Sequence, residues 1–243
     1  MSKNPSDEAF KDMRKEILTP YLKVHGFSLY KTNAYVRRNS GDILEYLDLQ
    51  KERYGARTMA VNFAIQPLYV PGEKWLNTGF GGRLAGLAYG KDLWLDYHNE
   101  KQAKRSFNEI KHLAEVNLFP WFELMREEKN YLGDLRQGDR NWEGNVFSSC
   151  VGNRRIDWIT CYYLYQGRQQ EAQAYLEEKE KDLQYNKKEY WYDNAMQRLE
   201  RMKELCVEAA GEKGVLYGFM AENAAKWKLP KAVFSSTEKE LRV

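Results

Sequence analysis

The chain has 243 residues, of which 43% are hydrophobic, enough for one large or two small domains with an ordinary core. Its 38 basic and 35 acidic residues leave a net charge of only +3, which disfavours nucleic acid as a partner because no strong phosphate-binding field results. No stretch approaches the roughly 18 consecutive apolar residues of a membrane span, and residues 1–8 lack the apolar segment of a signal peptide, so we expect a cytoplasmic globular protein without membrane contact.

The first predicted element is a helix near the N-terminus. Its apolar residues recur at helical spacing as Phe10, Met13, Ile17 and Tyr21. Ser6 is a capping residue ahead of them, and Pro20 should bend the helix near its end. Gly26 suits the left-handed position that ends a helix, which lets Phe27 contact Leu22 in a Schellman motif.

The pattern then changes to the alternation that is typical of strands. Met59, Val61, Phe63 and Ile65 alternate with smaller or polar residues, so we expect them on the covered face of a sheet. Turn residues at 39–42 and 54–55 separate three strands, expected at 34–38, 43–53 and 57–68, in an antiparallel meander. A fourth strand is expected at 93–97, after a loop at 77–90.

Helices follow the sheet. The stripe Ala103, Phe107, Ile110 and Ala114 predicts a helix at residues 100–116, and Pro120 suits the first turn of another helix. Residues 133–152 are rich in Gly, Asp and Arg, which favours a connecting segment between an α+β domain at 1–132 and a helical region at 153–243. Four helices are expected in that region. The predicted fold class is therefore α+β, with an antiparallel three- to four-stranded meander covered by helices and followed by a C-terminal helical bundle.

Residues 10–126 carry a family resemblance. The helix that ends in Leu22, Gly26 and Phe27 is followed by Tyr35-Val36-Arg37-Arg38, Leu47-Asp48-Leu49-Gln50-Lys51, Val61-Asn62-Phe63-Ala64-Ile65 and Leu118-Phe119-Pro120-Trp121-Phe122. In this order the segments resemble the domain-of-unknown-function 4304 family. The resemblance implies a small α+β domain and brings no established activity, cofactor or catalytic residue. Some such domains look similar to immunity proteins of bacterial toxin systems, which bind and block a partner.

Two groups of residues are candidates for a protein contact. Arg136, Arg140 and Trp142 occur together in the connecting segment, and arginine with tryptophan is typical of binding hot spots. A solvated linker of mixed charge has the same composition, so both interpretations stay open at this point. Tyr89, Trp94 and Tyr97 are expected to be further partner-binding residues.

Polar residues on the predicted strands form a second candidate site. Gln50 and Asn62 carry amides that can satisfy neighbouring backbone groups or read a ligand. Asp96 and His98 lie two residues apart, hence on one face of a strand, where they could share a proton or hold a metal. No second histidine pair and no CxxC motif accompany them, and residues 86–92 lack the spacing of a phosphate loop. We therefore expect no metal and no cofactor.

The resemblance and the lack of a catalytic set favour a non-catalytic, immunity-type domain that binds a protein partner such as a toxin. The alternative is a hydrolase that uses Asp92 or Asp96 together with His98, which requires these groups to converge in one pocket. The cysteines, Cys150, Cys161 and Cys206, are odd in number and widely spaced, which favours reduced thiols. The sequence leaves the partner and the oligomeric state open, a homo-oligomer included.

Overall fold

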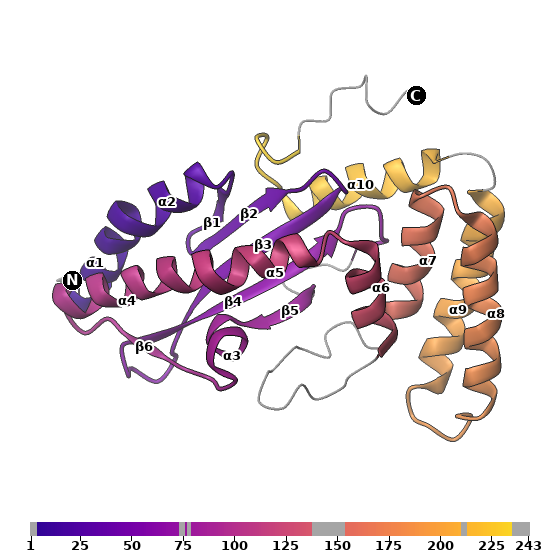
Figure 1. The fold of residues 1–243 in the computed structure, drawn as a ribbon, viewed down its shortest axis with the longest axis horizontal. Helices are drawn as coiled ribbons and strands as arrows, with labels where there is room; N and C mark the ends of the chain where they lie inside the picture. Colours follow the sequence, from indigo (N-terminus) through magenta and orange to yellow (C-terminus); the bar gives the residue numbers. More distant parts are fainter. Residues whose placement is uncertain (1–3, 73–75, 77–78, 138–153, 210–212, 235–243) are drawn as a thin grey trace.

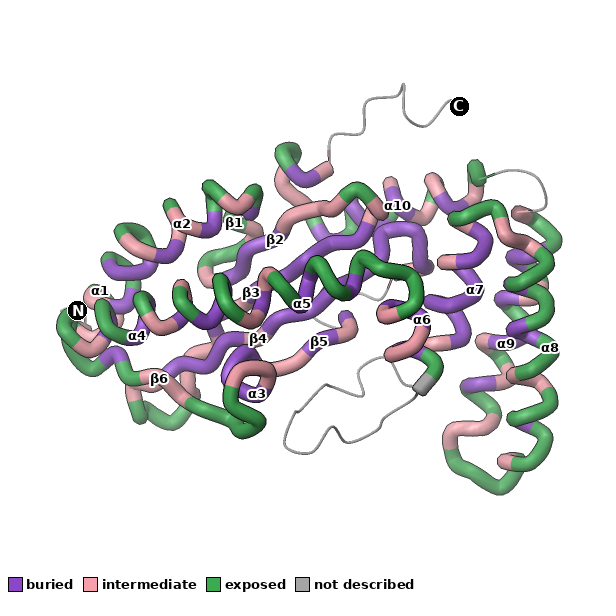
Figure 2. The backbone as a smooth tube through the Cα atoms, viewed as in Figure 1, coloured by how far each residue is buried: buried purple, intermediate pink, exposed green. Residues whose placement is uncertain are grey.

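The computed structural model describes residues 4–72, 76, 79–137, 154–209 and 213–234. Within them, one antiparallel sheet is covered by helices from the N-terminal half, and further helices from the C-terminal half pack at one end of the sheet (Figure 1). Burial is concentrated in the central strands and in the inward faces of the helices (Figure 2). The predicted α+β class, with a meander followed by a helical region, is confirmed.

The N-terminal helix runs through three segments, α1 (Pro5–Met13), the π-helical turn η1 (Arg14–Leu18) and α2 (Thr19–Val24). Its cap is Asn4 and not Ser6, because the Asn4 side chain accepts a hydrogen bond from the Ser6 backbone N–H at 3.1 Å. The π-helical turn lies just before Pro20, whose missing N–H and bulky ring disfavour an ordinary α-helical turn there. The predicted Schellman ending is confirmed, since Phe27 N–H donates to the Leu22 carbonyl at 3.0 Å and Gly26 has φ +82°.

A second long helix repeats this design in α4 (Glu100–Leu113), η3 (Ala114–Leu118) and α5 (Phe119–Leu124). The sequence pattern predicted that one helix ends near Val116 and that another starts with Pro120. The structure instead continues the helix, because the π-helical turn absorbs the proline without a break.

The sheet has the order β1-β2-β3-β4-β5, and β6 pairs with β4. Its strands are β1 (Ser28–Lys31), β2 (Ala34–Arg38), β3 (Ile43–Lys51), β4 (Thr58–Pro67), β5 (Phe80–Arg83) and β6 (Leu95–Asp96). The three meander strands, β2 to β4, are confirmed, whereas the predicted strand at 93–97 shortens to two residues. Strands β1 and β5 and helix α3 (Leu84–Tyr89) were not predicted, and the last two lie where a loop was expected.

Both faces of β4 are buried. Met59, Val61, Phe63 and Ile65 face the long helices as predicted, and the Phe63 ring lies 4.9 Å from the Trp121 ring of α5. Helix α10 (Gly214–Trp227) covers part of the opposite face of the sheet (Figure 1). There the Tyr30 hydroxyl donates to the Trp227 carbonyl at 2.7 Å.

The C-terminal half contains the four predicted helices, α7 (Arg155–Tyr165), α8 (Gln169–Gln184), α9 (Tyr192–Glu208) and α10. Helix α6 (Glu128–Gln137) occupies the start of the expected connecting segment, and residues 138–153 lie outside the described residues. The halves meet where the ring of Tyr69 stacks on that of Tyr165 at 4.4 Å. Helices α8 and α9 form a hairpin that extends away from the sheet (Figure 1).

Candidate functional site

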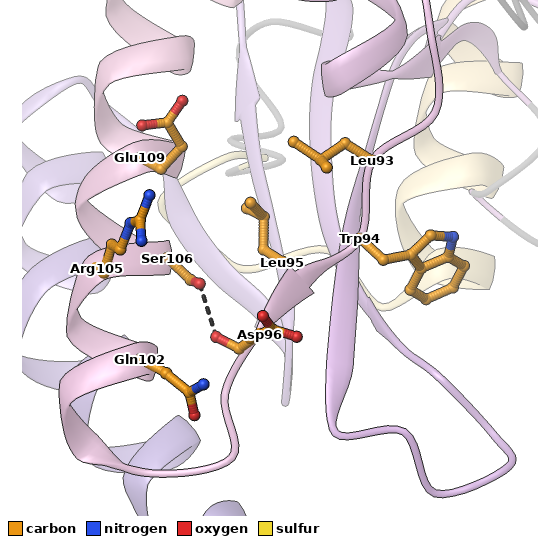
Figure 3. Close-up of a pocket in the computed structure, with 8 residues that line it drawn as sticks. All are labelled: Leu93, Trp94, Leu95, Asp96, Gln102, Arg105, Ser106 and Glu109. Carbon is orange, nitrogen blue, oxygen red and sulfur yellow. Dashed lines mark hydrogen bonds between the residues drawn. The ribbon is translucent and has the colours of Figure 1, made fainter.

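A pocket of about 370 Å³ lies between residues 93–96 and helix α4 (Figure 3). We call it the β6–α4 pocket, and it is lined by Leu93, Trp94, Leu95, Asp96, Gln102, Arg105, Ser106 and Glu109. Its volume falls at the lower end of the range of about 300–1,000 Å³ that is usual for ligand pockets. The pocket can therefore admit one or two side chains of another molecule.

Three local interactions hold the walls of this pocket in place. Leu95 and Asp96 pair with the start of β4, so one wall is part of the sheet. Asn99 caps α4 by accepting a hydrogen bond from the Gln102 backbone N–H at 3.0 Å. The Ser106 hydroxyl donates to the Asp96 backbone carbonyl at 2.7 Å, which ties the helix to the strand across the pocket (Figure 3).

The helical wall carries the polar groups of the pocket. Gln102, Arg105 and Glu109 are spaced three and four residues apart, so they share one face of α4 (Figure 3). Glu109 accepts a hydrogen bond from the Tyr89 hydroxyl at 2.5 Å, and this bond raises the pKa of Tyr89. Within the described part of the chain Arg105 has no ion-pair partner, which leaves its exposed guanidinium available to a bound molecule.

The strand wall carries the apolar groups. Leu93 is 36% exposed, and Tyr89, which ends α3 and is bonded to Glu109, is 46% exposed. The Trp94 ring points away from α4 (Figure 3) and lies under the Arg83 guanidinium at 4.8 Å, a cation–π contact that fixes its orientation. Arg83 in turn lies 4.0 Å from the Asp92 carboxylate.

The structure divides the predicted partner-binding residues into separate places. Trp94 lines the β6–α4 pocket, and Tyr89 reaches the pocket only through its hydrogen bond to Glu109. Tyr97 is only 2% exposed and packs edge-on against Phe10 at 5.1 Å, so its expected place on a binding surface is corrected to the core. Arg136 lies far along the chain on α6, where its guanidinium contacts the Tyr175 ring at 5.2 Å. Arg140 and Trp142 fall outside the described residues, as does Cys150.

The predicted polar residues also divide into two groups. Asn62 donates to the Gln50 side-chain oxygen at 3.1 Å and to Asp48 at 3.4 Å, so these polar groups satisfy one another on the sheet. Burial raises the pKa of Asp48, which the sequence analysis did not single out. A polar residue at every second position of β3, Asp48 and Gln50, was the signal that could have identified it.

Asp96 and His98 lie near each other, with 3.7 Å between a carboxylate oxygen and the imidazole Nε2. Their side chains are 55% and 50% exposed, and His98 does not line the pocket. Within the described ranges no group of three His, Cys, Asp or Glu residues is placed to hold a metal ion. The same part of the chain has no helix with both the length and the apolar character needed to cross a bilayer.

The helical wall of the pocket, on α4, was not predicted from the sequence. Gln102, Arg105 and Glu109 follow helical spacing beside the apolar stripe of α4, so their common face was readable. Nothing local, however, indicates that this face meets residues 93–96. That meeting depends on the pairing of β6 with β4, which joins residues distant in the sequence.

Comparison with known proteins gives one match. Residues 18–124 match the family described as Domain of unknown function (DUF4304), a segment that runs from the end of η1 to the end of α5. The matched segment therefore contains the whole sheet and both walls of the β6–α4 pocket. No curated protein and no solved structure matches the chain. Residues 18–124 thus belong to the DUF4304 family, as the resemblance of the sequence predicted.

Proposed function

We propose that the protein is a non-catalytic binding protein that holds a protein partner at the β6–α4 pocket. The observation that carries this proposal is that exposed Leu93, Trp94 and an Arg105 without an ion pair all line one pocket, with exposed Tyr89 bonded to Glu109 of its helical wall. Tyr, Trp and Arg are enriched among residues that dominate binding energy, especially around a pocket that excludes water.

The rigidity of the pocket supports binding as its role. One wall is held by strand pairing and the other belongs to a 14-residue helix, and the bond from Ser106 to Asp96 joins them. A surface that is already ordered loses little conformational entropy when a partner binds. The pocket therefore offers a preformed hollow with an apolar wall and a polar wall that carries Arg105.

The alternative, a hydrolase, is disfavoured by the same geometry. General acid–base catalysis requires its groups within hydrogen-bond reach of one substrate. Asp96 lines the pocket but His98 does not, and Asp92 lies beside Arg83. Asp96 and His98 are neighbours at the surface, but Asp92, Asp96 and His98 do not all line one pocket, so binding explains the pocket better than hydrolysis does.

An immunity-type role is the form of this function that the family resemblance favours, with a toxin as the partner. In that role the β6–α4 pocket would receive side chains of the toxin and block its surface without any chemistry. We place this interaction in the cytoplasm, since Cys161 and Cys206 are both buried free thiols, which suits a reducing compartment.

The test is capture of the partner from cells that naturally make the protein, with the tagged chain as bait. Trp94→Ala should weaken capture of the same partner about thirtyfold, the factor that corresponds to about 2 kcal/mol for a binding anchor. Because Trp94 also contacts Arg83, a second variant, Arg105→Glu, reverses an exposed charge that has no ion pair to lose.

The matched control is Tyr54→Ala, which removes an aromatic side chain that is 96% exposed in the turn between β3 and β4. It should capture the partner as the unmodified chain does. If Trp94→Ala and Arg105→Glu both fold and both retain full capture, the partner does not use the β6–α4 pocket and the proposal fails.

A further inference from the structure

The turn between α8 and α9 exposes two aromatic side chains to an unusual degree. Tyr185 is 90% exposed and Tyr190 is 97% exposed, and the turn lies at the end of the hairpin that extends away from the sheet (Figure 1). An aromatic side chain can bury about 150–250 Å² at a contact. Neither tyrosine contributes that area to the core, so both are available to a partner.

A pocket of about 190 Å³ adjoins this turn. We call it the hairpin pocket, and helices α6, α7, α8 and α9 contribute to it together with Asn186 and Trp191 of the turn. Its charged lining residues are Arg136, Arg155, Lys179 and Asp182, so three positive charges against one negative charge leave a charge of +2. The turn that carries the two exposed tyrosines therefore adjoins a hollow that favours an anion.

The cations of the hairpin pocket are held over an aromatic wall. The Arg136 guanidinium lies 5.2 Å from the centre of the Tyr175 ring, and the Lys179 ammonium lies 5.9 Å from it. The Arg136 guanidinium also donates to the Tyr163 hydroxyl at 3.2 Å. These contacts orient the two positive groups within one pocket.

The carboxylates that pair with these cations lie at the surface. Glu178 is 3.3 Å from Arg136 and its side chain is 51% exposed, and Asp182 is 2.7 Å from Lys179 with 56% exposed. Ion pairs exposed in this way contribute only about 0–1 kcal/mol. An incoming carboxylate can therefore replace them at little cost.

We propose that the hairpin pocket and the two exposed tyrosines form a second docking surface, which takes an acidic protein segment. A carboxylate side chain of the partner enters the hairpin pocket beside Arg136 and Lys179. Tyr185 and Tyr190 pack on the apolar residues that flank this carboxylate. The surface lies on the C-terminal half and requires nothing of the β6–α4 pocket.

Charge distribution favours a protein over a nucleic acid at this surface. Glu178, Asp182, Glu189 and Asp193 are interspersed with the basic residues around the turn. The evenly spaced phosphates of a nucleic-acid strand would meet these carboxylates and be repelled. A peptide segment needs to place only one carboxylate in the pocket.

The experiment is an NMR titration of the full chain with a short synthetic peptide that carries one glutamate flanked by leucines. Its arms are the same peptide with glutamine in place of glutamate, and a single-stranded oligonucleotide. The glutamate peptide should shift the amide signals of residues 179–191 and the Trp191 indole signal, and its affinity should fall as salt is added. Shifts at residues 93–109 would report the β6–α4 pocket separately.

The double variant Tyr185→Ala, Tyr190→Ala removes exposed side chains that the fold does not need, and it should bind the glutamate peptide at least tenfold more weakly. Lys179→Glu should do the same, whereas Tyr54→Ala, also an exposed tyrosine, should bind unchanged. The proposal is overturned if residues 179–191 do not shift at about 1 mM peptide, where an interaction of about 4 kcal/mol is half saturated. Equal binding of the glutamine peptide, tighter binding of the oligonucleotide, or full binding by the variants would also overturn it.

Discussion

Replacing Phe63 with alanine tests the layer in which helices cover the sheet. Phe63 is 2% exposed, and its ring meets the rings of Trp121 and Phe122 edge-on at 4.9 and 6.4 Å. Each such ring pair contributes about 0.5–1.5 kcal/mol beyond the area that it buries. Together with the transfer of the ring into water and the cavity left behind, the substitution should lower the free energy of unfolding by about 3–5 kcal/mol.

Urea denaturation followed by fluorescence and circular dichroism measures this loss. With a slope of about 3 kcal/mol/M, the midpoint should fall by about 1–1.7 M. Tyr54→Ala is the control, because a side chain that is 96% exposed should change stability by no more than about 0.5 kcal/mol. A loss below about 1 kcal/mol for Phe63→Ala would refute the packing of this face of β4 against α5.

Two further predictions use the same titration. Burial raises the pKa of Asp48, so the folded chain keeps its proton to a higher pH than the unfolded chain and loses stability as pH rises through that value. Asp48→Asn should therefore raise the urea midpoint at pH 7 and leave it unchanged at about pH 3, below the unfolded pKa of about 3.9; a lower midpoint at pH 7 would contradict this account. An added Cβ at Gly81 would lie 2.0 Å from the Phe63 carbonyl oxygen, so Gly81→Ala should push β5 from β4 and cost about 1–3 kcal/mol. Gly218→Ala in α10, where nothing lies within 4 Å of the new Cβ, should instead raise the free energy of unfolding by about 0.5–1 kcal/mol. A urea midpoint for Gly81→Ala at or above that of the unmodified chain would contradict the close pairing of β5 with β4.

The elements that the sequence predicted best are those in which near neighbours along the chain decide the structure. The Schellman ending at Gly26 and Phe27 needs only one turn of helix and a residue that tolerates positive φ. The alternation from Met59 to Ile65 likewise places these side chains on one face because successive residues of a strand point to opposite sides.

The elements that were missed depend on contacts between distant residues. Strand β5 contains Gly81 and Gly82, which have poor strand propensity, and it exists because β4 pairs with it at close range. The helix that continues through Pro120 was expected to restart there, since a π-helical turn leaves no clear local signature.

The candidate site shows the same division. Tyr89 and Trp94 could be selected from residue type alone. The burial of Tyr97, in contrast, depends on its packing against Phe10, a residue far from it in the sequence. The helical wall with Arg105 is part of a pocket because the pairing of β6 with β4 places residues 93–96 opposite α4.

The sequence by itself therefore determined the fold class, the meander, the C-terminal helices and the family of residues 18–124. Periodicity and turn chemistry act over a few residues, and they are readable without a structure. Tertiary structure alone decided which faces meet: α10 on the second face of the sheet, residues 93–96 against α4, and Arg136 beside the turn of a distant hairpin. These arrangements follow from burial and pairing between segments far apart in the chain, which no local pattern encodes.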